Sequence, residues 1–342
     1  MFENILPLYG LNSDKTTVKL FGDGLINHTW KVSTDDQNFI LQKVNNDVFK
    51  SPGYIDENIS LIKQYLDIKY PNYLFVSPVN ALNGESLLDT DFGYYRLFPF
   101  VEGSTSHNSL TNKQEAYEAA RQFGKFSRIL AGFDAALLNI TIPDFHNLKL
   151  RYQQFLEACN TADPSRLQAS ANEINFINAN KNIVDTYCKI VDSKEIPLRV
   201  VHHDTKINNV LFDLGNNGLC IIDLDTVMPG HFISDVGDMM RTYLAEASEE
   251  ETDLSKIVIR KDFYDAIYSG YMDEMKDVLT LKEKEYFNYA GKFIIYMQAI
   301  RFLTDFLQDD IYYGSRYEGH NFNRAKNQIA LLKEYQKMKG SL

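Results

Sequence analysis

Short apolar runs separated by turn residues fill the first hundred residues, which is typical of β-strands. Two runs in "TVKLFGDGLINHTWKVST" (residues 17–34) flank a turn that contains Gly22 and Gly24, and "NFILQKV" (residues 38–44) is a third run. A fourth run, "GYYRLFPFVEG" (residues 93–103), stops at Pro99 because proline cannot continue a strand ladder. We therefore predict a β-rich amino-terminal part that ends near residue 100.

Apolar residues at helical spacing predict one helix within this part and mainly helices after it. The segment "SPGYIDENISLIKQYL" (residues 51–66) has a proline near its start and places four apolar residues on one face: Ile55, Ile59, Ile62 and Leu66. Thr111 and Gln114 have the spacing of a capping box, and the helix after them is expected to stop near Gly132. Its predicted buried face consists of Ala116, Ala120, Phe123, Ser127 and Leu130.

A second capping box, Thr280 with Glu283, predicts one long helix that starts there. Its predicted buried face consists of Tyr286, Ala290, Phe293, Met297 and Ile300. Gln298, Arg301 and Asp305 form a polar stripe on the same helix. From spacing alone, this stripe is equally well read as a solvent-facing strip with an Arg301–Asp305 pair or as part of a binding site.

Composition excludes several classes of protein. A chain of 342 residues is long for a single core, which favours two lobes. The net charge of -11 and the lack of a basic run argue against a nucleic-acid or anionic-membrane partner. Cys159, Cys188 and Cys220 lie far apart, so neither a disulfide framework nor a zinc site is expected. No membrane span and no signal peptide are apparent, and we expect a cytoplasmic protein.

The segment "VVHHDTKINNVLFDLGNNGLCIIDLDT" (residues 200–226) combines apolar strand-like runs with several carboxylates. A turn centred near Asn216 would place Asn209 opposite Asp223, with Asp204 delivered to the same end of the hairpin. Two hard oxygen ligands suit Mg²⁺ on nucleotide phosphates, and a third carboxylate suits proton acceptance from a hydroxyl. The alternative is that Asp204 and Asp223 only cap the loop. The full H-x-D-x-x-x-x-N spacing, followed by I-D-x-D, favours phosphoryl transfer.

"HHDTKINNVLF", "IIDLDTVMPG" and "SDVGDMMR" together resemble the aminoglycoside phosphotransferase and choline kinase superfamily. The chain is most similar to the N-acetylhexosamine 1-kinases, and "FILQKVNNDVFKSP", "RLFPFVEGST" and "QAIRFLTDFLQDDIYY" follow the order of that group. The resemblance implies an α+β, two-lobed protein-kinase-like fold. It places a nucleotide-binding lobe at residues 1–98, a hinge at 99–103, and a helical lobe with the catalytic loop and acceptor pocket at 104–342.

The resemblance also assigns roles to residues of the hairpin. It makes Asp204 the general base, and it makes Asn209 and Asp223 the ligands of Mg²⁺ on ATP. Asp225 shares a strand face with Asp223, so it is expected to reach a second metal or the substrate. One of His202 and His203 is expected to pack and fix the loop.

At the nucleotide end, the resemblance makes the turn with Gly22 and Gly24 the phosphate cover, although an ordinary hairpin explains two glycines equally well. A phosphate-binding cation belongs on the third strand, where either Gln42 or Lys43 faces inward, and Glu57 is the expected partner of that residue. Adenine is expected at the hinge, and the residues assigned to it are Phe98, Phe100 and Val101.

At the acceptor end, the resemblance assigns Arg301 and Tyr312 to the sugar pocket, together with Asp204 and Asp223. Leu25 stands where a histidine is often found in the hexosamine kinases. The implied reaction transfers the γ-phosphate of ATP to the anomeric hydroxyl of an N-acetylhexosamine, with no protein partner. Kinases of aminoglycosides, choline, homoserine or another hexose are alternatives, as is a kinase-like binding module without activity.

Overall fold

The computed structural model describes residues 1–22 and 26–338, and it divides into two compact units. The first unit contains Met1–Ser106, Gly132–Pro143 and Val210–Pro229, and the second contains His107–Ala131, Asp144–Asn209 and Gly230–Leu342. The predicted division was a single hinge at residues 99–103. The first unit also contains two later segments of the chain, and each of them supplies hydrogen-bond partners to its helix α2 (Pro52–Lys69).

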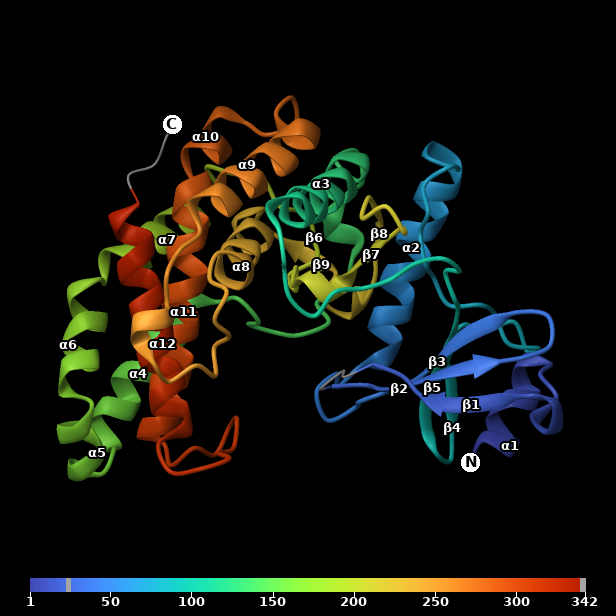
Figure 1. Cartoon of the computed structure of the whole chain (residues 1–342), viewed down its shortest axis with the longest axis horizontal. Helices are drawn as coiled ribbons and strands as arrows, with labels where there is room; N and C mark the ends of the chain where they lie inside the picture. Colours follow the sequence, from blue (N-terminus) through green and yellow to red (C-terminus); the bar gives the residue numbers. More distant parts are fainter. Residues whose placement is uncertain (23–25, 339–342) are drawn as a thin grey trace. The chain divides into compact units, whose positions relative to one another are not determined.

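The first unit is built on a five-stranded antiparallel sheet of order β1-β2-β3-β5-β4 (Figure 1). Its strands are β1 (Thr17–Leu20), β2 (His28–Ser33), β3 (Asn38–Val44), β4 (Leu88–Thr90) and β5 (Gly93–Pro99). The predicted runs at residues 17–34, 38–44 and 93–99 are therefore confirmed. Gly24 and Leu25, in the turn between β1 and β2, lie outside the described residues.

One face of this sheet carries the core of the first unit. Alternate residues such as Leu41 and Leu97 pack against Ile5 and Leu6. These two come from the short helices α1 (Phe2–Ile5) and η1 (Leu6–Tyr9). Gln42 and Arg96 are paired across β3 and β5 and lie one residue along from Leu41 and Leu97. Since successive side chains of a strand alternate, they project from the opposite face.

Helix α2 (Pro52–Lys69) joins the separate segments of the first unit. The four predicted apolar residues of this helix are buried, as its periodicity indicated: Ile55, Ile59, Ile62 and Leu66. Asn58 is also buried, and its Nδ2 donates to the carbonyl oxygens of Asn139 (2.9 Å) and Val227 (3.0 Å). Its Oδ1 accepts from the Asn139 nitrogen at 2.8 Å. A single asparagine thus holds both later segments against the helix.

The hairpin of β7 (Val210–Phe212) and β8 (Gly218–Ile221) forms as predicted, but its register differs by one residue. Val210 pairs with Ile221, whereas a turn centred at Asn216 pairs it with Ile222. The prediction was wrong because a bulge lies between Leu211 and Phe212, and because Asp213 accepts bonds from the nitrogens of Gly215 and Asn217. Asp213 therefore serves the turn.

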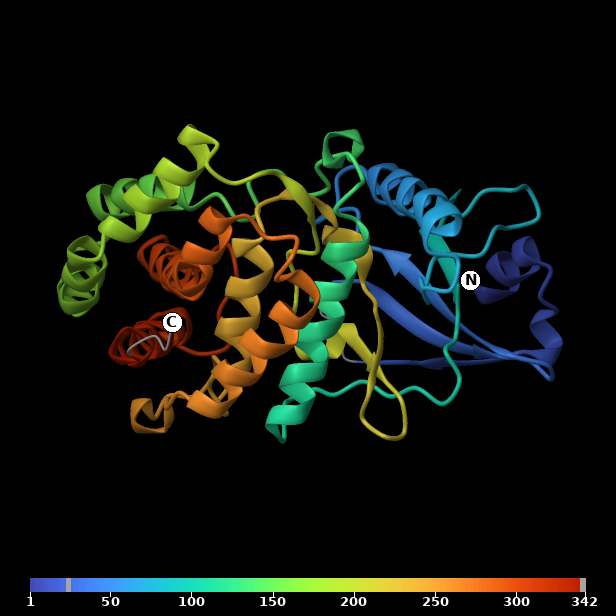
Figure 2. The same cartoon turned by 90° about the horizontal axis from the view of Figure 1, so that it is seen from above.

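The second unit is mainly helical. Figure 2 shows α3 running beside α9, and the long helix α11 lies against α12, α8 and α4. Strand β6 (Arg199–Val201) precedes the catalytic loop, and β9 (Met228–Gly230) lies where the chain returns to this unit. The helices are α3 (Lys113–Ile129), α4 (Leu148–Thr161), α5 (Pro164–Ala169), α6 (Ala171–Ala179), α7 (Asn182–Ser193), α8 (Ile233–Tyr243), α9 (Lys261–Met275), α10 (Leu281–Glu285), α11 (Phe287–Leu307) and α12 (His320–Lys337).

Two predicted helix starts need correction. The cap of α3 is Asn112, whose side chain accepts from the Glu115 nitrogen, while the Glu115 carboxylate accepts from the Thr111 nitrogen. The N-cap of α3 therefore lies one residue later than predicted, at Asn112 in place of Thr111, and Glu115 takes the place of Gln114. The Thr280–Glu283 box is confirmed, but it starts only the short helix α10. Tyr286 leaves helical geometry (ψ 1°), so α11 is a separate helix. None of the helices within residues 1–22 and 26–338 combines the length and apolar character that a membrane crossing requires.

Candidate active site

The loop after β6 is fixed to helix α8 through its backbone. The carboxylate of Asp235 accepts from the nitrogens of His202 (3.1 Å) and His203 (2.7 Å). His202 is fully buried with its ring edge-on to Phe123. His203 has a left-handed backbone (φ 68°), and its Nδ1 lies 2.8 Å from the Ser234 hydroxyl. Both histidines therefore hold the loop, where a single one was expected to do so.

Asp204 follows these histidines and keeps part of its side chain accessible, at 25% exposure. Its Oδ2 accepts from Asn209 Nδ2 at 3.1 Å and faces Lys206 Nζ at 2.9 Å. Asn209 Nδ2 also donates to the Asp204 carbonyl at 2.8 Å. Asp204 and Asn209, predicted to act together, are thus brought together within the second unit.

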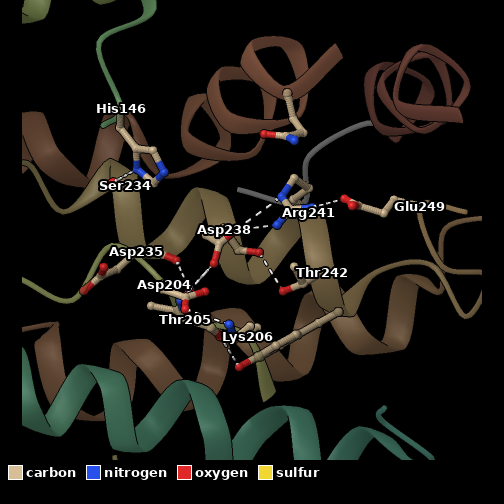
Figure 3. A network of polar contacts seen from close by, with 12 residues as sticks. His146, Asp204, Thr205, Lys206, Ser234, Asp235, Asp238, Arg241, Thr242 and Glu249 are labelled. Atoms are coloured by element: carbon tan, nitrogen blue, oxygen red, sulfur yellow. Dashed lines mark hydrogen bonds and ion pairs between the residues drawn. The ribbon is translucent and has the colours of Figure 1, made fainter. Parts of the chain in front are cut away.

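Helix α8 supports this loop with a second carboxylate, Asp238 (Figure 3). Asp238 Oδ2 accepts from the Thr205 nitrogen at 2.8 Å, so this residue ties the loop to α8. Arg241 donates to Asp238 Oδ1 at 3.1 Å and also reaches Glu249 at 3.1 Å. Burial raises the pKa of Asp238, and Arg241 opposes that shift. Arg241 was missed, although its spacing of three residues from Asp238 is that of a helical ion pair.

The N-cap of α8 is Phe232, which has no side-chain cap, although Ser234 and Asp235 at the start of "SDVGDMMR" are residue types that favour this position. The two polar side chains are not free to cap because they serve the loop and its neighbours. Ser234 meets His203 and His146, and Asp235 meets the two loop nitrogens. Burial raises the pKa of Asp235 to about 6.

A cavity of about 300 Å³ within the second unit brings together two of the four predicted sugar-binding residues, and Asp204 and Asp223 are not part of its lining. Arg301 and Tyr312 both line it, with Arg151, Tyr313 and Asp305 among their neighbours. The Arg301 guanidinium lies 5.9 Å from the Tyr312 ring centre and 5.3 Å from that of Tyr313. Such aromatic and cationic groups suit a ligand with an apolar ring face and many oxygens.

The polar stripe on α11 is not a solvent-facing strip. Asp305 is buried, and its carboxylate accepts from the nitrogens of Tyr312 (2.7 Å) and Tyr313 (3.0 Å). Arg301 instead donates to Gln298 at 3.2 Å. Asp305 therefore shapes the loop that carries both tyrosines, and this loop is what brings Tyr312 to the cavity.

Arg151, on α4, is a cavity residue that sequence reasoning missed. It donates to Gln154 and to the Asp144 carbonyl. Burial lowers the pKa of Arg151 first, and the charge of Arg301 lowers it further. Two guanidinium groups thus lie close enough to repel each other. Nothing in "LKLRYQQF" marked this arginine, because its neighbour on α11 is distant in sequence.

In the first unit, the second carboxylate of the I-D-x-D motif is buried in an ion pair. Asp225 Oδ1 lies 2.5 Å from Arg96 Nη2, and its Oδ2 accepts from Asn27 Nδ2 at 2.7 Å. Asp223, two residues earlier, has a left-handed backbone (φ 61°) that leads into the turn η5 (Leu224–Thr226). Arg96 was missed, although a lone charge in an apolar strand is itself a signal.

Gln42, and not Lys43, lies on the Arg96 side of the sheet. Gln42 Oε1 accepts from Arg96 Nε (3.2 Å) and Nη2 (2.9 Å). Lys43 Nζ lies 5.9 Å from the Tyr95 ring centre, on the face that carries the core. The expected partner Glu57 accepts from Asn139 at 2.8 Å.

The remaining predicted nucleotide residues lie on the sheet or beside it. Gly22 has a positive φ of 74°, with open space around it. Phe98 is in β5, 5.1 Å from the Arg96 guanidinium. Phe100 donates its nitrogen to the Asn38 carbonyl, and the Val101 carbonyl accepts from Ser104.

The donor groups fit a magnesium ion that is held mainly by phosphate oxygens. Within the described residues, no group of three or more His, Cys, Asp and Glu side chains is placed to hold a metal by itself. Mg²⁺ with a nucleotide needs only one or two protein oxygens. The amide nitrogen of Asn209 is committed to Asp204, so the atom it offers a cation is its oxygen.

Comparison with known proteins decides the family. The model of the phosphotransferase enzyme family matches residues 17–257. The chain belongs to this family. A spectinomycin phosphotransferase, solved with ADP and spectinomycin, is 15% identical over 98% of both chains, with a TM-score of 0.59. An aminoglycoside phosphotransferase from Alicyclobacillus acidocaldarius is 11% identical over 97% of this chain and 95% of that one, with a TM-score of 0.66.

A microcompartment-associated aminopropanol kinase is also similar, at 14% identity over 98% of this chain and 95% of that one, with a TM-score of 0.60. The mixed α+β, protein-kinase-like fold is thereby confirmed. The family acts by phosphoryl transfer, and the motif "HHDTKINN" lies within the residues that match it, so this chain is a kinase-like phosphotransferase.

Proposed function

We propose that this phosphotransferase transfers the γ-phosphate of ATP to the anomeric 1-hydroxyl of an N-acetylhexosamine, either N-acetylglucosamine or N-acetylgalactosamine. The observation that carries the proposal is a cavity lined by both Arg301 and Tyr312, two of the residues that the hexosamine-kinase resemblance assigns to the sugar. A cavity of about 300 Å³ with several hydrogen-bonding groups suits a molecule of this size. We place the enzyme in the cytoplasm, where ATP is available.

In this reaction Asp204 accepts the proton of the sugar hydroxyl. The sugar oxygen forms the new bond to phosphorus as the bond between the γ-phosphorus and the β-phosphate oxygen breaks, and ADP leaves. Asn209 holds the Asp204 carboxylate through the bond at 3.1 Å. Mg²⁺, which Asn209 and Asp223 would hold, neutralises phosphate charge when it is bound with the nucleotide. Positioning and charge neutralisation supply most of the catalysis.

The electrostatics of the cavity favour a neutral sugar over a cationic acceptor. Arg151 and Arg301 both line it, and Asp305 is engaged by backbone nitrogens. The other carboxylate of the lining, Glu157, belongs to an exposed residue. Aminoglycosides and choline carry positive charges, which two guanidinium groups repel. Sugar hydroxyls and the acetamido carbonyl accept hydrogen bonds from arginine without that penalty.

The test is an acceptor panel with ATP and magnesium, read by release of ADP. We expect turnover with N-acetylglucosamine or N-acetylgalactosamine, and none with kanamycin, choline or homoserine. The 1-O-methyl glycoside of the accepted sugar should be inert, because its anomeric oxygen has no proton to lose. The control is Asp204→Asn, which should still bind ATP but turn over at least about 100-fold more slowly.

Different results would point to different alternatives. Turnover of the methyl glycoside would move the reaction to another hydroxyl, and turnover of kanamycin or choline alone would replace the sugar. No turnover on any acceptor, with ATP still bound, would favour a binding module. An Asp204→Asn variant as fast as the unaltered enzyme would remove Asp204 from the role of base.

A further inference from the structure

Four polar side chains from four separate segments of the first unit converge on one buried spot. Arg96 (β5) and Asp225 (η5) form an ion pair at 2.5 Å, and each side chain is only 3% exposed. Gln42 (β3) accepts two hydrogen bonds from Arg96, and Asn27 donates to Asp225 at 2.7 Å. We call these four residues the arginine cluster.

Both oxygens of the Asp225 carboxylate accept a hydrogen bond from another member of this cluster. Its Oδ1 meets Arg96 and its Oδ2 meets Asn27. Asn27 is itself fixed, because its Oδ1 accepts from the Asn45 nitrogen at 3.0 Å. A carboxylate held on both oxygens by side chains that are anchored elsewhere is well suited to fix a loop. It is poorly suited to coordinate a cation.

Burying an ion pair of this kind is a weak way to gain stability, because both charges lose their water. The position of the Arg96–Asp225 pair in the chain indicates a role other than stability. Asp225 lies in the turn η5, and the residue that enters this turn is Asp223, in the left-handed conformation that few residues other than glycine, asparagine and aspartate adopt. The arginine cluster holds the turn, and therefore holds the backbone that orients Asp223.

One member of the cluster, Gln42, lies on the third strand, where a kinase-like fold has the lysine of its lysine–glutamate pair. Gln42 is neutral, and Lys43 lies on the opposite face of the sheet. Glu57 is an exposed residue that accepts from Asn139. The buried cation that meets Gln42 belongs to Arg96, on the neighbouring strand.

We propose that Arg96 and Asp225 are a buried positioning pair that fixes Asp223 for the metal–nucleotide complex. Arg96 holds Asp225, Asp225 holds the turn that follows Asp223, and Asp225 is not itself a metal ligand. This inference rests on the use of a metal–nucleotide complex in the proposed function, and it does not depend on the acceptor.

The experiment measures Mn²⁺ binding in the presence of saturating ADP, from the electron paramagnetic resonance signal of free Mn²⁺. The variants are Arg96→Gln, Asp225→Asn and the double variant. Each single change should weaken Mn²⁺ binding by about 10-fold or more, as loss of an outer-shell partner does. The double variant should be no weaker than either single variant, because the pair acts as one unit. Binding of ADP without metal, measured by isothermal titration calorimetry, should stay within about twofold, because the change is confined to the metal site.

Controls separate positioning from general destabilisation. Arg199→Gln breaks a comparable buried pair, Arg199–Glu283, in the second unit and should leave Mn²⁺ binding unchanged. The double variant removes both buried charges at once, so it is expected to fold even where a single variant does not. If a single variant fails to fold, Arg96→Lys and Asp225→Glu take its place, and each should still lose affinity for Mn²⁺.

The proposal is overturned if Asp225→Asn abolishes Mn²⁺ binding while Arg96→Gln leaves it intact, because Asp225 would then be a ligand. It is also overturned if the two effects multiply in the double variant, if neither change has an effect, or if Arg199→Gln has the same effect. An unaltered protein that binds no Mn²⁺ with ADP contradicts both this inference and the proposed function. Paired effects on Mn²⁺ with an inactive sugar panel contradict only the choice of acceptor.

Discussion

At the scale of single residues, the carboxylates near the catalytic loop differ in role because they differ in surroundings. Asp204 keeps an accessible side chain beside Asn209 and Lys206, as a group that must reach a substrate requires. Asp235 is buried and holds the nitrogens of His202 and His203. Burial and hydrogen-bond partners therefore decide which carboxylate can react and which one supports the loop.

Asp235 gives a prediction about pH. Burial raises its pKa from 3.8 to about 6, so the folded protein binds this proton more tightly than the unfolded chain does. The contribution of Asp235 to stability therefore falls as pH rises from about 4 to about 6, and then levels off. The free energy of unfolding of the unaltered protein, minus that of Asp235→Asn, should drop by about 2 kcal/mol between pH 4.5 and 7. Urea unfolding at the two pH values measures it.

Asp213→Asn is the control with the opposite sign. Hydrogen bonds from Asn217 lower the pKa of Asp213, so its contribution to stability is present above the unfolded pKa and is lost as pH falls. The corresponding difference for this variant should rise or stay level as pH rises from 4.5 to 7. A difference for Asp235→Asn that also rises would show that burial does not dominate at Asp235.

At the scale of elements, strong periodicity was enough to find several of the helices and strands, but not their details. The apolar faces of α2 and α3 and the runs of β3 and β5 were all predicted. The hairpin register was missed by one residue because a bulge at Leu211 and Phe212 leaves no trace in an apolar pattern. The break at Tyr286 was missed for a similar reason, since α10 and α11 share one periodic pattern.

Close packing of α3 on α9 gives the second prediction. A Cβ added to Gly270 on α9 would lie 2.2 Å from the Tyr117 carbonyl oxygen of α3, and backbone atoms of a packed helix cannot move aside easily. Gly270→Ala should lower the free energy of unfolding by about 1–3 kcal/mol, although alanine favours helices more than glycine does. Gly53→Ala on α2, where nothing lies within 4 Å, is the matched control and should be neutral or slightly stabilising. Equal urea midpoints for the two variants would contradict the prediction.

At the scale of the whole molecule, the sequence predicted residue types better than their partners. The motif "HHDTKINN" located Asp204 and Asn209, because motif residues are close in sequence. Arg96 and Asp225 are 129 residues apart, and the ion pair exists only because the chain returns to the first unit at Val210–Pro229. Arg151 and Arg301 meet for the same reason. Local patterns carry no information about such returns.

These returns give the last prediction, which concerns the fragment Met1–Ser106. This fragment has the complete five-stranded sheet and helix α2, and by sequence order it resembles an independent domain. It lacks Asp225, so Arg96 would keep a buried charge without its partner, and it lacks Asn139 and Val227, the partners of buried Asn58. Unpaired buried groups cost several kcal/mol, comparable to the stability of a domain this small. We therefore expect the fragment to unfold without a cooperative urea transition, followed by circular dichroism, under conditions where the full chain shows one. A sharp transition in the fragment would show that the sheet and α2 suffice.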